Sequence, residues 1–173
     1  MVISIGEILV DLFGRTAEDG VSFKQCAGGA PFNVACAASK AGYKSGFVGR
    51  VGEDLFGKYL KGYAEGIGFD YLDVAEDKNA NTTLAIVSLD EFGERSFCFY
   101  RKNTADYRID EAQVKSAVNH AEIVHLGTLM LGTDEGVAIA DYTVAEAKAQ
   151  GKVLSLDVNY RDDIFAGKNA VEI

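Results

Sequence analysis

Small and polar residues that could hold a sugar-sized ligand are concentrated between residues 28 and 52. Paired glycines let the backbone approach a ligand with φ angles that other residues avoid, and a proline suits the first turn of a helix. An asparagine in that turn can both donate and accept hydrogen bonds, which suits a polyol hydroxyl. Taken alone, Gly-Gly-x-Pro is more typical of a glycine turn before a buried helix. The residues concerned are Gly28, Gly29, Pro31, Asn33, Ala35, Gly42 and Gly52.

A carboxylate follows the first apolar run of the chain, residues 2–10. That run predicts one buried strand, which Asp11 ends. Ligands of open α/β sheets bind at the carboxyl ends of strands, and a carboxylate there can accept hydrogen bonds from two neighbouring sugar hydroxyls. The alternative is an aspartate that opens a turn, and the residue alone does not decide between the two.

Aromatic residues and an arginine end the second strand of a predicted hairpin. Alternation places Phe97 and Phe99 on one face of that strand. Their rings could cover a bound sugar and exclude water, or they could pack the hairpin onto the core or a second subunit. Arg101 could reach a substrate oxygen or an anion, and its alternative is a salt bridge on the surface of the hairpin.

A last polar group follows the predicted strand over residues 153–158. The side chains of Asn159 and Arg161 could bind a polar or anionic ligand there. A simple turn at the end of a strand is the alternative for both residues.

The order of the predicted elements is typical of an α/β protein. Strands alternate with helices, which implies a parallel sheet with helices on both faces. A hairpin over residues 82–101 interrupts this alternation and predicts a small projecting β element, joined by a strand over residues 21–26. Helices are expected over residues 31–41, 54–65, 110–121 and 133–150, and further strands over residues 45–50, 69–74 and 123–126. Asp54 and Asp110 are expected to cap the second and third helices, and Thr133 or Asp134 to open the fourth.

Composition limits the functional classes. The 173 residues include 17 Lys and Arg against 26 Asp and Glu, a formal charge of −9, which disfavours nucleic acid and anionic membranes as partners. The N-terminus lacks the features of a signal peptide, and no run approaches the roughly 20 apolar residues of a membrane helix, so a cytoplasmic location is expected. Three widely spaced cysteines predict neither a zinc site nor a disulfide framework.

Three motifs together carry a family resemblance. The glycine, proline and asparagine spacing over residues 28–52 resembles the first signature of the ribokinase-like (PfkB) carbohydrate kinases. Residues 99–106, with Phe-Tyr-Arg and then Ala-Asp, and residues 157–161, with Asp-x-Asn-x-Arg, are similar to fructokinases of that family. The resemblance implies a ribokinase-like fold, which is a three-layer, doubly wound, mostly parallel sheet with a small β lid. Residues 1–173 would then be the N-terminal part of one such domain, with lid strands at about 12–27 and 80–104.

The resemblance also implies an activity and a role for each candidate residue. Such enzymes transfer the γ-phosphoryl group of ATP to a primary hydroxyl of a ketohexose, with Mg²⁺ as the expected metal ion of the full-length enzyme. Sugar-binding residues would be Asp11, Gly28, Gly29 and Asn33, with Phe97, Phe99 and Arg101 covering the sugar and Asn159 and Arg161 on the phosphate side.

The catalytic half of such an enzyme is not expected in this chain. Relatives take their base from a later Gly-Ala-Gly-Asp segment, which these 173 residues lack, so the base is expected beyond Ile173. The resemblance likewise implies that an Asn-x-x-Glu element that organises the metal, and loops that hold adenine, lie in the absent C-terminal half, and no metal site is predicted here. We expect the chain by itself not to phosphorylate sugar.

We also expect the chain to form a homo-oligomer through the lid or through an exposed sheet edge.

Two alternative functions stay open. The 2-keto-3-deoxygluconate kinases share the Asp-x-Asn-x-Arg element and the lid arginine, but tend to carry tyrosine where Phe99 stands, so Phe99 favours a neutral ketose. A non-catalytic fragment that binds sugar, or only a partner chain, belongs to a different class. A Rossmann dehydrogenase is excluded, because no dinucleotide fingerprint follows the first strand.

Overall fold

The computed structural model describes residues 1–17, 20–89, 95–160 and 165. It contains a five-stranded sheet with the order β5-β4-β1-β8-β9 and a four-stranded sheet with the order β3-β2-β6-β7. The strands are β1 (Val2–Ile5), β2 (Leu9–Ala17), β3 (Gly20–Gly28), β4 (Ser45–Gly52), β5 (Tyr71–Asp77), β6 (Leu84–Leu89), β7 (Arg95–Tyr100), β8 (Ile123–Leu126) and β9 (Val153–Leu156). The helices are α1 (Ala30–Lys40), α2 (Leu55–Ile67), α3 (Glu111–His120), the 3₁₀ helix η1 (Leu129–Gly132) and α4 (Asp134–Ala149).

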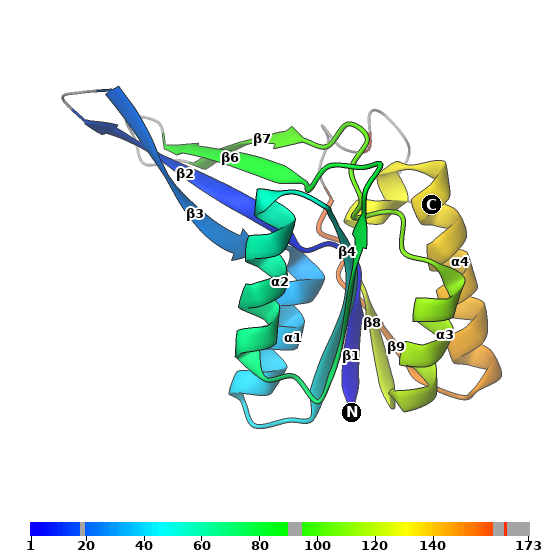
Figure 1. The fold of residues 1–173 in the computed structure, drawn as a ribbon. Coiled ribbons are helices and arrows are strands. Elements are labelled where there is room, and N and C mark those ends of the chain that lie inside the picture. Colours follow the sequence, from blue (N-terminus) through cyan, green and yellow to red (C-terminus); the bar gives the residue numbers. More distant parts are fainter. Residues whose placement is uncertain (18–19, 90–94, 161–164, 166–173) are drawn as a thin grey trace.

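The five-stranded sheet is the middle of three layers. All its strand pairs are parallel, with α1 and α2 on one face and α3 and α4 on the other (Figure 1). Because both faces are covered, β1 and β4 are buried along most of their length. The α/β three-layer architecture implied by the family resemblance is therefore confirmed.

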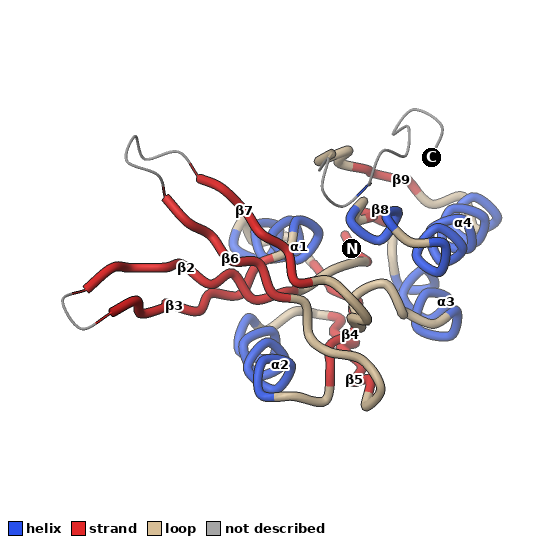
Figure 2. The backbone as a smooth tube through the Cα atoms, turned by 90° about the horizontal axis from the view of Figure 1, so that it is seen from above, coloured by secondary structure: helices blue, strands red, loops and turns tan. Residues whose placement is uncertain are grey.

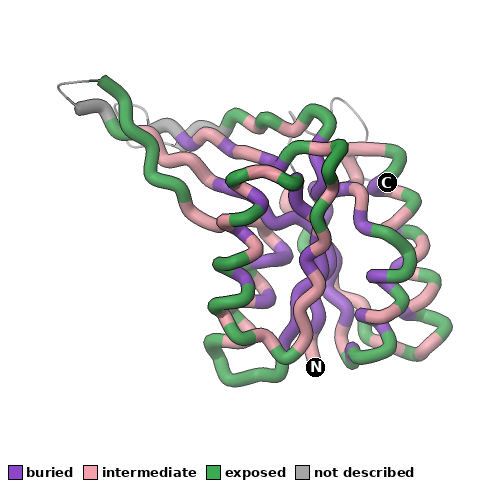
Figure 3. Tube along the Cα trace, in the orientation of Figure 1, coloured by how far each residue is buried: buried purple, intermediate pink, exposed green. Residues whose placement is uncertain are grey.

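Each face of this sheet has its own hydrophobic core. Ile3, Ile5 and Val124 pack against α3 and α4, whereas Phe47 and Val74 pack against α1 and α2. Purple buried segments accordingly lie along the central strands in Figure 3. Because all the strands are parallel, their carboxyl ends lie at one edge of the sheet.

The four-stranded sheet projects from that edge and forms the lid. The strands β2 and β3 are an antiparallel pair of nine residues each, β6 is parallel to β2, and β7 is antiparallel to β6. Figure 2 shows the lid extending away from the helical layers. The lid is more exposed toward its tip, where Val21 and Phe23 are 63% and 51% exposed.

The first strand of the sequence prediction is wrong. The apolar run over residues 2–10 forms two strands in different sheets, β1 and β2, which are separated at Gly6 and Glu7. Gly6 has φ +149°, and its N–H still donates to Val48 O at 3.0 Å before the chain turns away. Asp11 therefore lies inside the lid strand β2, and does not end β1. An apolar run cannot reveal the change of sheet, because both strands are buried there.

The helix starts follow their predicted caps. Asp54 accepts the N–H of Gly57, and Asp110 forms a capping box with Gln113. Thr133 caps α4 through the N–H of Gly136. The short helix η1 before α4 was not predicted from the sequence, and it buries Leu129 beneath the lid.

Apolar side chains are exposed on β9, which pairs with β8 alone among the described residues. Val153 and Leu156 are 60% and 56% exposed, and Val158, just after the strand, is 59% exposed. We predict that Val153→Lys with Leu156→Lys weakens self-association of the chain, because charges on an edge strand oppose pairing with another copy. Sedimentation velocity over a range of concentrations measures this. Leu55→Lys on α2, at an 85% exposed position away from the edge, is the control. A wild-type chain that stays monomeric throughout would contradict the expectation.

Candidate functional site

Two glycines shape the loop that joins the lid to α1. Gly28 is the last residue of β3, and Gly29 is the N-cap of α1 with φ +115°. A Cβ on Gly28 would lie 2.2 Å from Asp11 Oδ2, and one on Gly29 would lie 2.4 Å from Glu7 O. No side chain fits at either position while Asp11 and Glu7 stay in place. The backbone of this loop is therefore held against Glu7 and beside the Asp11 carboxylate.

Asp11 and Phe99 lie on the same face of the lid. Asp11 is opposite Ala85 of β6, and Ala85 is opposite Phe99 of β7. Two strand spacings separate them, so their backbones are roughly 10 Å apart. Asp11 is partly buried, and this burial raises the pKa of its carboxyl. The structure thus brings together two of the predicted site residues across the lid, although one lies on β2 and the other on β7.

An apolar floor lies between them. Leu9, Ala85 and Leu129 form a buried cluster, and Phe99 packs against it. Phe99 therefore serves as a packing residue of the lid base, and its ring is only partly buried. The side chain of Phe97 lies outside the described part of the chain, so its predicted position over a sugar stays a prediction.

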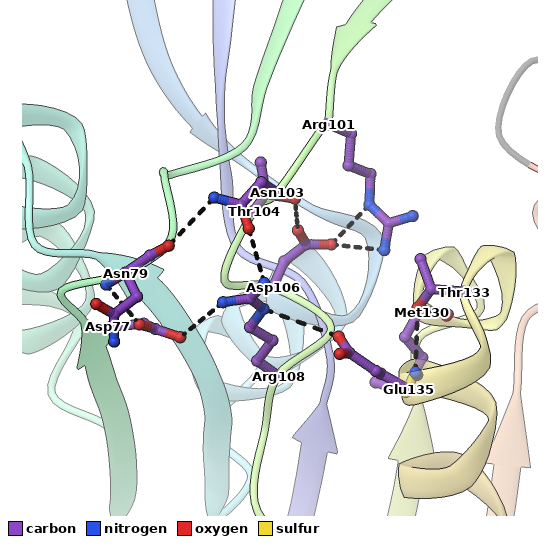
Figure 4. A network of polar contacts seen from close by, with 11 residues as sticks. Asp77, Asn79, Arg101, Asn103, Thr104, Asp106, Arg108, Met130, Thr133 and Glu135 are labelled. Carbon is purple, nitrogen blue, oxygen red and sulfur yellow. Dashed lines mark hydrogen bonds and ion pairs between the residues drawn. The ribbon is translucent and has the colours of Figure 1, made fainter.

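Arg101 is held by a buried carboxylate that the sequence analysis did not assign. Its Nε donates to Asp106 Oδ2 at 2.7 Å, and its Nη2 lies 2.7 Å from the same oxygen (Figure 4). The side chains of Arg101 and Asp106 are 8% and 1% exposed. The guanidinium also lies 5.1 Å from the ring centre of Tyr107. Arg101 does form a salt bridge, but in the interior and not on the surface of the hairpin.

The other oxygen of Asp106 binds two hydroxyl groups. Thr83, just before β6, donates to Oδ1 at 2.5 Å, and Thr104 donates to it at 2.7 Å. The carboxylate therefore joins residues at the base of β6 and of β7. The sequence did mark Asp106, which is the aspartate of the Phe-Tyr-Arg…Ala-Asp motif. Spacing alone could not show that its carboxylate pairs with Arg101.

A second ion-pair group continues this network toward the body. Arg108 donates to Asn103 Oδ1 at 2.7 Å and contacts Asp77 at 3.5 Å and Glu135 at 3.8 Å (Figure 4). These partners lie on the loop after β7, on β5 and on α4. The segment that follows β7 is therefore tied to the central sheet at β5 and to the helical layer at α4.

An open cavity of about 1210 Å³ lies at the base of the lid. Phe99 and Arg101 line it, together with Thr82, the start of α2 and Thr133 at the start of α4. Asn33 is exposed and lines a separate cavity of about 400 Å³ between α1 and α2. The predicted sugar residues are therefore not all gathered in one cavity. The strand register is the better guide to the site, because it places Asp11 and Phe99 on one face.

Glu7 is a buried acid next to the glycine loop. Its side chain is 2% exposed, and Oε1 accepts the N–H of Ala30 at 3.0 Å. Oε2 has no hydrogen-bond partner among the described residues. Burial, opposed by backbone hydrogen bonds and reinforced by the charge of Asp106, raises the pKa of Glu7 to about 8, so it is mostly protonated at pH 7. Nothing in the sequence marks Glu7 as a site residue, because it stands within an apolar run.

The predicted phosphate-side residues are only partly described. Asn159 has φ +28°, and its N–H donates to Asp157 Oδ1 at 3.2 Å. Thr128, after β8, donates to Val158 O at 3.0 Å and ties this turn to the neighbouring strand end. Arg161 lies outside the described residues. A role for Asn159 and Arg161 toward phosphate stays a prediction.

Known proteins similar to this chain are carbohydrate kinases. The pfkB family carbohydrate kinase model matches residues 1–170. The chain belongs to this family. Probable fructokinase-5 of Arabidopsis thaliana is 37% identical over 98% of the chain and 54% of its own length, and Fructokinase-2 of Oryza sativa subsp. japonica is 35% identical over 98% and 52%. The chain thus spans about half the length of these curated relatives.

Solved structures of the pfkB family agree with the fold. A fructokinase from Xylella fastidiosa superimposes with a TM-score of 0.90 at 32% identity, over 99% of this chain and 55% of that one. A structure of fructokinase from the same organism with bound ATP gives a TM-score of 0.89 at 31% identity, over 99% and 56%. In the described part of our chain, no helix is both long and apolar enough to cross a membrane.

The described residues provide no metal centre of their own. Nowhere among them do three or more His, Cys, Asp or Glu side chains come together in a way that could hold a metal ion. The letters Asn-x-x-Glu, expected of the metal element in pfkB relatives, do occur at residues 119–122. There, however, Glu122 pairs with the N-terminal ammonium group at 2.5 Å, at the amino end of the parallel sheet. The Asn-x-x-Glu sequence at residues 119–122 is therefore not a candidate metal-binding element.

The glycine loop gives a first prediction for the site. Gly29→Ala should lower the free energy of unfolding by about 1–3 kcal/mol, because its φ of +115° and its contact with Glu7 O both exclude a Cβ. Gly62→Ala in α2, where no atom lies within 4 Å of a new Cβ, should raise it by roughly 0.5–1 kcal/mol. Urea denaturation of both variants measures the difference. A Gly29→Ala protein as stable as wild type would refute the assigned loop geometry.

Glu7 gives a pH prediction. Its pKa rises from 4.5 in the unfolded chain to about 8 in the folded one, so the folded state binds more protons between these values. The free energy of unfolding should therefore fall as pH rises from 5 to 8, by up to about 1.4 kcal/mol per pH unit from this group. Glu7→Gln keeps an oxygen for the Ala30 N–H and should remove that slope in denaturation curves. The exposed Glu65→Gln is the control, and an unchanged slope in Glu7→Gln would exclude the assignment.

Proposed function

We propose that this chain is the sugar-binding, N-terminal part of a fructokinase-like kinase, with residues 1–173 belonging to one domain and the lid inserted near residues 12–27 and 80–104. The reaction is transfer of the ATP γ-phosphoryl group to a primary hydroxyl of a ketohexose. The observation that carries the proposal is the placement of Asp11 and Phe99 on one lid face, beside the Gly28 and Gly29 loop. Membership of the pfkB family and the fructokinase relatives support it.

Each residue has a physical role in this proposal. The Asp11 carboxylate accepts hydrogen bonds from two sugar hydroxyls, while the backbone at Gly28 and Gly29 approaches the sugar closely. Asn33, in the first turn of α1, adds an amide that can donate to and accept from a hydroxyl. Phe97 and Phe99 cover the C–H groups and exclude water, and Arg101 donates a hydrogen bond from the lid.

ATP is the proposed phosphoryl donor, supported by the family and by the fructokinase relative whose structure holds ATP. When bound, the nucleotide and Mg²⁺ supply the transferred group and neutralise its charge. Asn159 and Arg161 are the residues of this chain proposed to face the phosphate. The described residues do not fit a Mg²⁺ site, and no Gly-Ala-Gly-Asp base is present in the sequence. The chain by itself is therefore proposed to bind sugar without turning it over.

A 2-keto-3-deoxygluconate kinase is the second candidate. The lid arginine favours it, but Phe99 offers no hydroxyl for an acidic sugar. A non-catalytic sugar-binding or assembly fragment is the third.

We further propose a cytoplasmic protein that forms a homo-oligomer through the lid or the β9 edge, with no nucleic acid or membrane partner.

Calorimetric titration with fructose tests the proposed function. The wild-type chain should bind fructose, and Asp11→Ala should weaken binding by about tenfold or more, as expected for the loss of charge-assisted hydrogen bonds. Asp141→Ala, at an exposed position on α4, is the matched control and should bind like wild type.

Each contrary outcome selects another function. No heat with fructose but heat with 2-keto-3-deoxygluconate would favour the acidic-sugar kinase. No heat with either sugar would leave a partner-binding module. ATP-dependent phosphorylation of fructose by the pure chain would refute the proposal that its chemistry needs further residues.

A further inference from the structure

The charge of Arg101 is cancelled inside the protein. An arginine on a sugar-binding lid would normally attract anions, since its guanidinium is always protonated. Here the same guanidinium is paired with Asp106, which is 1% exposed and lies 2.7 Å from two of its nitrogens. We propose that Asp106 is a specificity-determining residue, which makes the lid site favour neutral sugars over sugar acids. This inference rests on the proposed sugar-binding function and adds the substrate class.

Asp106 is held where it is by three other residues. Thr83 and Thr104 donate to Oδ1, and Arg101 donates to Oδ2, so both oxygens are engaged. These donors lie on either side of the lid base. The carboxylate cannot swing away from Arg101 without breaking the two hydroxyl contacts. Its negative charge is consequently fixed beside Arg101, which itself lines the cavity.

Arg101 keeps one hydrogen-bond donor for a ligand. In Figure 4 its third guanidinium nitrogen points away from Asp106, and Arg101 lines the large cavity together with Phe99. A sugar hydroxyl can accept a hydrogen bond from that nitrogen with no net charge required. A carboxylate would be attracted by the guanidinium and repelled by the carboxylate behind it, in a buried setting where charges are poorly screened. The repulsion offsets most of the gain that a free arginine would offer.

Other charges of the cavity do not restore a positive field. Asp54 and Lys102 also line it, with opposite signs. Burial opposes ionisation of Asp54, but hydrogen bonds from the N–H groups of Gly57 and Thr82 outweigh it and hold its pKa below the usual value. Lys102 is exposed and well solvated. The described charged groups that line the cavity, taken with Asp106, therefore sum to about zero.

A purely structural role of the pair is the competing explanation. Asp106 ties β6 to β7, and this tie would be needed whatever the ligand. The two explanations differ in one respect. If the pair only connects β6 to β7, the preference between a neutral and an acidic sugar should not depend on which charge remains in the cavity. Variants that remove one charge or both, titrated with a neutral and an acidic sugar, separate them.

The experiment measures binding of fructose and of 2-keto-3-deoxygluconate to the wild-type chain and to Asp106→Asn by calorimetry. Asparagine keeps an oxygen for Arg101 and removes the negative charge. We expect affinity for the acid to rise by about tenfold or more and affinity for fructose to change by less than about threefold. Asp77→Asn is the matched control, because it removes the carboxylate that contacts the neighbouring Arg108 outside the cavity lining, and should leave both affinities unchanged.

The double variant Arg101→Gln with Asp106→Asn keeps the test valid if Asp106→Asn does not fold, since it leaves no buried charge unpaired. With both charges gone, the ratio of fructose to acid affinity should stay within about threefold of wild type. A fall of the acid affinity relative to fructose by about tenfold would instead identify Arg101 as a free anion anchor and overturn the inference.

The readouts distinguish this inference from the proposed function. Fructose binding to the wild-type chain tests the function alone. The change in acid affinity from wild type to Asp106→Asn tests the role of Asp106 alone. An unchanged acid affinity in a folded Asp106→Asn protein overturns the inference and leaves the sugar proposal standing. A gain of acid binding without any fructose binding supports the role of Asp106 and overturns the fructokinase assignment.

Discussion

One buried carboxylate, Asp106, connects the lid to the body of the protein. Its oxygens bind Thr83 before β6 and both Thr104 and Arg101 after β7, and the chain continues directly into Tyr107 and the core beneath α3. Removing two charges from water costs about as much as their attraction returns, so the pair contributes orientation more than net stability. Phe99 lies two residues before Arg101, near the end of β7, and packs against the apolar floor of Leu9, Ala85 and Leu129.

A second constraint acts where the chain passes from the sheet into the lid. A Cβ on Gly29 would collide with Glu7 O, while the Glu7 side chain accepts the N–H of Ala30 in the first turn of α1. The charges of Asp106 and Arg101 act on Glu7 in opposite directions, the first raising its pKa and the second lowering it. The glycine loop and the Arg101–Asp106 ion pair therefore share one electrostatic environment. A protonated Glu7 leaves that environment with a single ion pair, which is easier to bury than three charges.

Periodicity and helix caps predicted much of the fold, whereas the sequence predicted the site only in part. The strand and helix alternation, the Asp54, Asp110 and Thr133 caps and the hairpin after residue 82 were all predicted, since each depends on local sequence. The change of sheet at Gly6 was missed, because an apolar run looks the same in either sheet. The partner of Arg101 was missed for a different reason: a buried ion pair is formed by tertiary packing, and neither residue type nor spacing specifies which carboxylate is nearest.

The two sides of the proposed site differ in how many contacts hold their residues in place. On the sugar side, Asp11 is fixed by pairing with β3 and β6, the glycine loop by Glu7, and Arg101 by Asp106. All of these contacts are made within residues 7–106, so the sugar side is organised before any ligand arrives, which lowers the entropy cost of binding. On the phosphate side, Asn159 follows β9, which has one strand neighbour among the described residues, and its N–H is bound only by the nearby Asp157. In the proposed function, recognition of sugar therefore depends on contacts inside this chain, whereas the proposed phosphate side is held by fewer of the contacts that the structure describes.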